Sequence, residues 1–167
     1  MAHAVLLIMM VYTFPEINAK LGTTAFDLKT FGYSFEEAIT MVQNLDTPTI
    51  KFYIFPQLTL LDVFYPALLA FFLNALLVRL IMLKNIPSST IFSILSFLPF
   101  LAMASDYSEN ITISLLITDN LVLSQSTIKM ASTFTQLKSL FTTLSWISVT
   151  ILFGQNLWTR YCSLKSK

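Results

Sequence analysis

The chain has 167 residues, of which 55% are hydrophobic and only 11% are charged, and its formal net charge is +1. A soluble domain usually carries about 25% charged residues, so this composition excludes an ordinary water-soluble domain and predicts an integral membrane protein. The basic residues are scattered and the net charge is small, so we expect no nucleic-acid partner and expect membrane lipids around the chain.

The inventory of metal-binding and redox side chains is small. Cys162 is the only cysteine and His3 is the only histidine. A single cysteine excludes an internal disulfide, and a single histidine excludes two-histidine ligation of zinc or haem within one chain. We therefore expect neither a metal nor another cofactor.

Long apolar stretches predict an all-α membrane protein. In lipid, backbone groups must be hydrogen-bonded within the segment, and roughly 20 helical residues cross the hydrocarbon core. We therefore predict one membrane domain over residues 1–167, built as a four-transmembrane-helix bundle. The expected spans are about 2–19, 56–83, 90–117 and 131–158.

The first expected span is short. Its apolar part covers 2–14, and a full span must continue past Pro15 and Glu16 to about Ala19. The alternative is a cleaved signal peptide with an apolar core at 4–14. No Lys or Arg precedes that core and no small-x-small site follows it closely, so we favour the span.

A polar connection is expected at 20–55, between spans 1 and 2. Within it, Ser34 and Glu37 have the spacing of a capping box, which predicts the start of a helix. Apolar residues then recur at helical spacing: Phe35, Ala38, Ile39, Val42 and Leu45. This pattern predicts a short amphipathic surface helix, which either lies on the membrane or, as we favour, packs its apolar side on the bundle.

The distribution of Lys and Arg near the span ends predicts the orientation. One side of the membrane carries the larger share of these residues: Arg79, Lys84, Arg160, Lys165 and Lys167. We therefore expect both termini and a tight turn at 84–89 on the cytoplasmic or matrix side. A bacterial or mitochondrial inner membrane is the favoured location.

Charged side chains within the expected spans form the candidate site. Asp106, Glu109 and Asn110 are spaced i, i+3, i+4 and share one helix face. Depths estimated from the helical rise place Asp62 and Lys138 in the same half of the membrane. We therefore predict an intramembrane polar cluster of these five residues.

Within this cluster, we expect Lys138 to pair with Asp106 or Glu109. Asn110, Tyr65 and Tyr107 are candidate hydrogen-bond partners. Two alternatives remain open. Buried acid–lysine pairs can fix helix register without any chemistry, and the acidic segment would be merely interfacial if the third helix ended near Met103.

Several segments together resemble a group of small, uncharacterised four-span membrane proteins of bacteria and eukaryotes. These segments are Phe14-Pro15, 31–37 (FGYSFEE), 61–66 (LDVFYP), 106–110 (DYSEN) and Leu137-Lys138. The resemblance covers most of the chain and implies four helices with Asp62, Asp106, Glu109 and Lys138 brought together. It implies no activity.

Two classes of function follow from these features. The first is a non-catalytic accessory or structural subunit of a larger membrane complex, in an energy-converting membrane, with other membrane-protein subunits as partners. The alternative is a small membrane enzyme or transporter of a lipid-soluble substrate, with Asp106 or Glu109 as acid/base and Lys138 as electrostatic partner, or a proton or cation pathway. A cavity of roughly 300 Å³ that reaches either carboxyl favours the alternative.

Overall fold

The structure, a computed structural model, describes residues 1–83 and 90–165, so the turn expected at 84–89 lies outside the described residues. The described part is helical and contains no strand, as the apolar stretches predict. Three helical stretches are long and apolar enough to cross a membrane. They are Ala2–Leu21, Thr47–Met82 and Gln125–Thr159.

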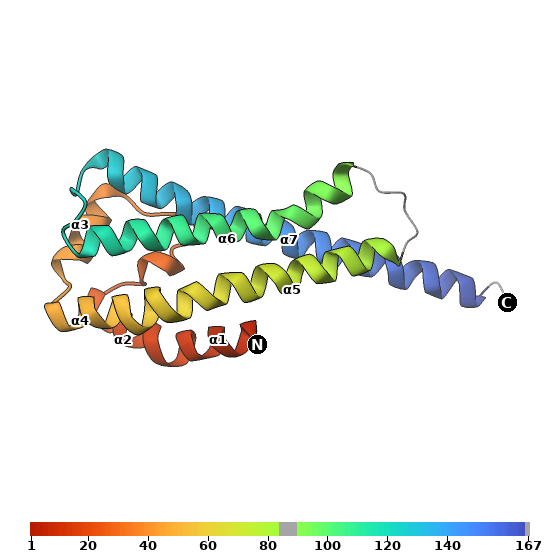
Figure 1. The fold of residues 1–167 in the computed structure, drawn as a ribbon, viewed down its shortest axis with the longest axis horizontal. Coiled ribbons are helices and arrows are strands. Elements are labelled where there is room, and N and C mark those ends of the chain that lie inside the picture. The colour runs from red at the N-terminus through yellow and green to blue at the C-terminus, as the bar shows by residue number, and fades with distance from the viewer. Residues whose placement is uncertain (84–89, 166–167) are drawn as a thin grey trace.

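The first helical stretch consists of α1 (Ala2–Ile8), the π-helical segment η1 (Met9–Thr13) and α2 (Phe14–Leu21). Pro15 lies in the first turn of α2, directly after the π-helical segment, and it has no backbone N–H to donate to the preceding turn. Gly22 ends the stretch in the left-handed conformation, with φ +69°. Figure 1 shows that the N-terminus lies about midway along the bundle, beside α5.

The connection that follows contains the 3-10 turn η2 (Phe26–Leu28) and the helix α3 (Phe35–Gln43). The predicted capping box is confirmed. The Ser34 hydroxyl accepts a bond of 3.1 Å from the Glu37 N–H, and the Glu37 carboxylate accepts one of 2.9 Å from the Ser34 N–H. Ala38 and Met41 are the buried residues of α3 and join the core at this end of the bundle.

The second long stretch consists of α4 (Thr47–Phe52), η3 (Tyr53–Leu61) and α5 (Asp62–Met82). The helical stretch begins before the predicted span start at Pro56, because Asp46 caps it at Thr47 by accepting a 2.9 Å bond from the Thr49 N–H. Phe55, just before the proline, leaves the helical conformation with φ −133° and ψ 121°, so the stretch is kinked there.

The helices α6 (Thr90–Ile117) and α7 (Gln125–Lys165) complete the bundle and pack alongside α5 (Figure 1). The bounds of α6 match the prediction, whereas α7 is longer than the expected 131–158. It begins earlier because the Ser124 hydroxyl accepts a 3.2 Å bond from the Thr127 N–H, which caps its first turn.

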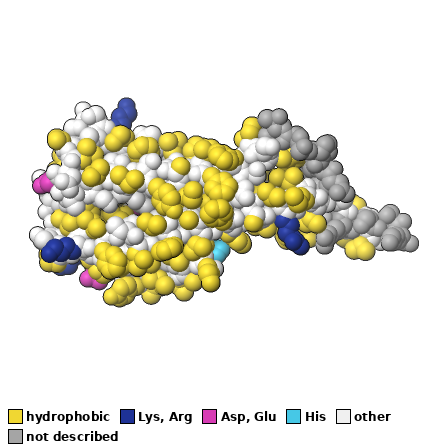
Figure 2. Space-filling view, viewed as in Figure 1, with side chains coloured by type: hydrophobic (Ala, Val, Ile, Leu, Met, Phe, Trp, Pro, Cys, Tyr) yellow, Lys and Arg dark blue, Asp and Glu magenta, His cyan; other side chains and the backbone are white. Residues whose placement is uncertain are grey.

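The outer surface of the bundle is apolar. Figure 2 shows most of the Lys, Arg, Asp and Glu side chains of this face near its left end, and hydrophobic side chains spread over the rest of the described surface. Large apolar side chains are exposed on all the long helices, among them Leu7, Phe71, Phe97 and Ile151. Such a surface suits contact with lipid.

Candidate functional site

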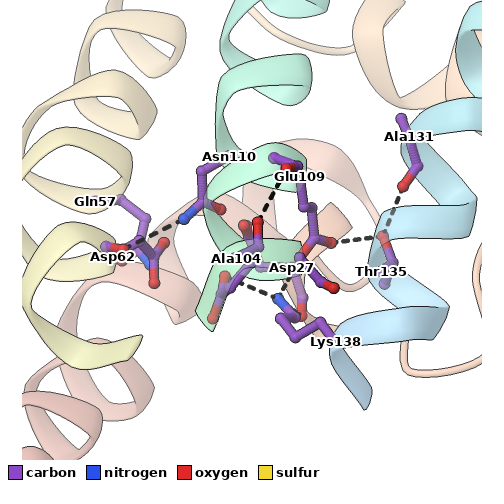
Figure 3. Close-up of polar contacts among 12 residues, drawn as sticks. Asp27, Gln57, Asp62, Ala104, Glu109, Asn110, Ala131, Thr135 and Lys138 are labelled. Carbon is purple, nitrogen blue, oxygen red and sulfur yellow. Dashed lines mark hydrogen bonds and ion pairs between the residues drawn. The ribbon is translucent and has the colours of Figure 1, made fainter. Parts of the chain in front are cut away.

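Lys138 on α7 is the centre of a buried polar cluster (Figure 3). Its Nζ forms an ion pair with the Glu109 carboxylate and lies 3.4 Å from Asp106 Oδ1. It also donates a hydrogen bond of 3.3 Å to the backbone oxygen of Asp27. Asp106 Oδ1 and the Asp27 backbone oxygen accept two of the three ammonium protons, whereas the Glu109 contact is an ion pair in which Oε2 is buried without a hydrogen-bond donor. The expected pairing of Lys138 is thus confirmed, with both acids rather than one.

Helical spacing on two helices brings these groups together. Asp106 and Glu109 lie one turn apart on α6, and Thr135 and Lys138 lie one turn apart on the facing side of α7. The Glu109 side chain is fully buried, and its carboxylate accepts a 2.5 Å bond from the Thr135 hydroxyl. Two residues one turn apart on α7 therefore hold Glu109 from two directions.

Asp62, at the start of α5, forms a second part of the cluster and is 3% exposed. Gln57 Nε2 donates a 2.6 Å bond to its carboxylate, and the Thr13 hydroxyl donates to Gln57 Oε1. Asn110 Nδ2 donates a 3.3 Å bond to the Asp62 backbone oxygen. The first helical stretch, η3, α5 and α6 are thus joined by buried hydrogen bonds.

Asp27 is a member of the cluster that the sequence analysis missed. It lies in η2, and the connection folds back into the bundle so that its backbone oxygen meets Lys138. The Tyr53 hydroxyl donates a 2.5 Å bond to Asp27 Oδ2, while Asp27 Oδ1 is buried without a partner. Ala25 and Phe26 beside it are fully buried, and this apolar pair within a polar connection is the signal that could have identified the segment.

The same connection is attached to α7 at a second point. The Tyr33 N–H donates a 3.0 Å bond to Ser132 Oγ, and Gln136 Nε2 donates a 2.8 Å bond to the Phe31 backbone oxygen. Gly32, between Phe31 and Tyr33 in the chain, has φ +83°, and a Cβ at this position would collide with Ser132 and Gln136. Burial raises the pKa of the Tyr33 phenol well above its ordinary value, so this side chain stays neutral beside the cluster.

One candidate hydrogen-bond partner of the cluster is wrong, and one alternative left open above is excluded. The Tyr107 hydroxyl donates a 2.7 Å bond to the backbone oxygen of Val63 rather than to a carboxylate. The third helix does not end near Met103 but continues to Ile117, so Asp106 is buried rather than interfacial.

A cavity of about 290 Å³ opens beside the cluster. Its charged lining residues come from four elements: Asp27, Asp62, Asp106 and Lys138. Its apolar wall includes Leu6 and Met9 of the first helical stretch, and Ser139 and Thr142 of α7 add hydroxyls. The cavity therefore joins a charged interior to side chains near the lipid-facing surface.

The charges around this cavity are unbalanced. Asp27, Asp62, Asp106 and Glu109 supply four carboxyl groups, whereas Lys138 is the ammonium among them. Because Lys138 is held by Asp106, Glu109 and the Asp27 backbone oxygen, the cavity offers a ligand mainly carboxylate acceptors. Within the described residues, no three potential metal-ligating side chains are close enough to hold a metal ion.

Comparison of the chain with protein-family models, with curated proteins and with solved structures finds no match. The chemistry of the cavity therefore follows from its own contacts and charges. A site with these properties suits a ligand that is small, that reaches the membrane interior, and that brings positive charge or several hydrogen-bond donors.

Proposed function

We propose that the chain is a four-span membrane protein in which α6 also crosses the bilayer, as the third span in chain order. Its 28 residues rise about 42 Å, enough to cross a hydrocarbon core of about 30 Å. Asp106, Glu109 and Asn110 are buried in the bundle, so they add no charge to a lipid-facing surface. In this arrangement α3 is an amphipathic helix at the membrane surface, and the C-terminus lies on the cytoplasmic or matrix side.

We propose further that the protein is a small membrane transporter or enzyme acting on a lipid-soluble substrate with a cationic, hydrogen-bond-donating group. The observation that carries this proposal is the cavity of about 290 Å³ that reaches Asp106 and holds an excess of carboxyl groups. A protonated amine placed there would compensate the buried negative charge and donate to the free carboxylate oxygens.

The residues around the cavity have distinct roles in this proposal. Asp106 receives or releases a proton at the substrate, because it lines the cavity. Lys138 holds Asp106 and Glu109 in place as their electrostatic partner. Asp62, oriented by Gln57, is the second carboxylate that the substrate meets.

Titration of the purified protein in detergent with hexylamine, followed by calorimetry, tests this function. We expect saturable binding that weakens at least about tenfold in Asp106→Asn and in Asp62→Asn, because each variant removes a carboxylate charge from the cavity. Asp46→Asn is the matched control: it removes an exposed carboxylate, while asparagine preserves the helix cap. Absence of binding, or equal binding by all three variants, would overturn the proposal.

A second candidate function, an accessory subunit of a membrane complex, is favoured by a separate apolar groove of about 490 Å³. The groove runs between the start of α5 and α6 and has these lining residues: Leu58, Thr59, Val63, Tyr107, Asn110, Ile111, Ser114 and Leu115. Its elongated apolar walls suit a transmembrane helix of a partner subunit.

Native electrophoresis of membranes extracted in mild detergent tests the subunit function. We expect the chain in a large assembly, and we expect Ile111→Trp to shift it to the size of the single chain by filling the groove. Leu140→Trp, at an exposed site on α7 outside the groove, is the control. Migration of the wild-type protein as a single chain, or an assembly indifferent to Ile111→Trp, would refute this function.

A further inference from the structure

The charged cavity shares two lining residues with a groove on the outer face of α7. Thr142 and Thr143 line both the cavity and this groove, which has a volume of about 370 Å³. Trp146, Ile147, Thr150 and Ile151 form the rest of the groove. The spacing of these six residues places them on one side of the helix, over a rise of about 14 Å.

The groove is exposed on the apolar surface of the bundle. Trp146 is 38% exposed, and Ile147 and Ile151 are about half exposed. On the opposite side of the cavity, Leu6 and Met9 belong to a helical stretch that packs mainly on α5 and makes few contacts with α7. A ligand that follows this side of α7 from the lipid to the cavity would cross neither end of the bundle.

The two ends of this path differ in chemistry. The inner end has Asp62 and Asp106 as acceptors and a Lys138 ammonium that is held by Asp106, Glu109 and the Asp27 backbone oxygen. The outer end is apolar, apart from threonine hydroxyls and the edge of Trp146. A molecule that fits both ends has a donor-bearing cationic head and a hydrocarbon tail, whereas an anionic head would face the carboxylates.

We infer that the ligand is a single-chain amphiphilic amine that enters sideways from the bilayer between α1 and α7, with its ammonium head at Asp62 and Asp106 and its tail along Trp146. This inference rests on the proposed binding function of the cavity and adds the tail, the route and the class of head group. The ammonium donates N–H bonds to the free carboxylate oxygens, and the tail covers the exposed groove.

Quenching of Trp146 fluorescence measures the position of the tail directly. Trp146 and Trp158 are the two tryptophans of the chain, so Trp158→Phe leaves Trp146 as the reporter. The protein is placed in phosphatidylcholine nanodiscs and titrated with dodecylamine brominated along its chain. We expect saturable quenching that unbrominated dodecylamine reverses and that needs at least about tenfold more amine in the Asp106→Asn variant.

Two further probes and two substitutions separate the parts of the inference. Brominated dodecanoate should give only the linear quenching of lipid partition, and brominated dodecyltrimethylammonium, which lacks N–H donors, should bind at least about tenfold more weakly. Thr142→Phe should block the junction of cavity and groove and abolish the saturable signal. Leu140→Phe adds the same ring to α7 away from both the cavity and the groove and should leave the signal unchanged.

The outcomes distinguish this inference from the function on which it rests. If hexylamine binds in an Asp106-dependent manner but brominated dodecylamine gives no saturable quenching, the amphiphile and its route are wrong and the cavity function stands. If neither amine binds, both are wrong. Equal saturable quenching by the amine and by the carboxylate would also overturn the assigned head group.

Discussion

Replacing Lys138 by methionine removes the positive charge from the cluster while preserving most of the side-chain volume. The substitution leaves Asp106 and Glu109 buried without their cation, and it leaves the Asp27 backbone oxygen without its donor. At 3.4 Å and an effective dielectric constant of about 20, the attraction between Lys138 and Asp106 is about 5 kcal/mol. The cost of desolvating both charges offsets part of this attraction.

We therefore expect Lys138→Met to lower the free energy of unfolding by about 3–5 kcal/mol, the range for removing one partner of a buried pair. Adding Glu109→Gln should restore part of the loss, because the amide is neutral and still accepts a bond from Thr135. Equilibrium unfolding of the purified protein in mixed micelles by added SDS measures both changes. A single variant within about 0.5 kcal/mol of the wild type, or a double variant less stable than the single one, would refute the reasoning.

Three further predictions concern the supports of the site. Ser34→Ala should cost about 1 kcal/mol of stability by removing the cap of α3, measured by thermal unfolding. The bond from the Ser34 N–H and the nearby Lys29 lower the pKa of Glu37, so its stabilisation of α3 is complete above the ordinary glutamate pKa and is lost as the pH falls through the lowered value. Amide hydrogen exchange of residues 35–43 in the wild type should therefore accelerate in that pH range. In Glu37→Gln the exchange, corrected for the intrinsic rate, should not depend on pH. Thr13→Val should destabilise the protein by about 1–2 kcal/mol in the SDS assay, because Gln57 Oε1 would lose its donor in the interior.

Local signals in the sequence predicted a large part of this fold. The capping spacing of Ser34 and Glu37 gave the start of α3, because this interaction involves only neighbouring residues. The i, i+3 spacing of Asp106 and Glu109 placed both on one face of α6. A lone lysine in an apolar stretch requires an acidic partner to offset the cost of its buried charge, so the pairing of Lys138 also followed from the sequence.

The parts that could not be predicted depend on contacts between distant segments. Asp27 enters the cluster because its connection folds back into the bundle, and no spacing rule reports such a fold. Gln57 was missed for a similar reason: it precedes Asp62 by less than two helical turns, but its partner Thr13 lies in another helix. The cavity also depends on how the first helical stretch packs on α5, which follows from side-chain shapes rather than from hydropathy.

Helix α7 is much longer than any bilayer requires. Its 41 residues rise about 62 Å, whereas the hydrocarbon core measures about 30 Å. Even at a tilt of about 40°, the upper end of the range for membrane helices, its projection on the bilayer normal is about 47 Å. At least about 17 Å of the helix must therefore overhang the hydrocarbon. In Figure 1 the C-terminal end of α7 extends past α5, so within the described residues no other helix packs beside its last turns.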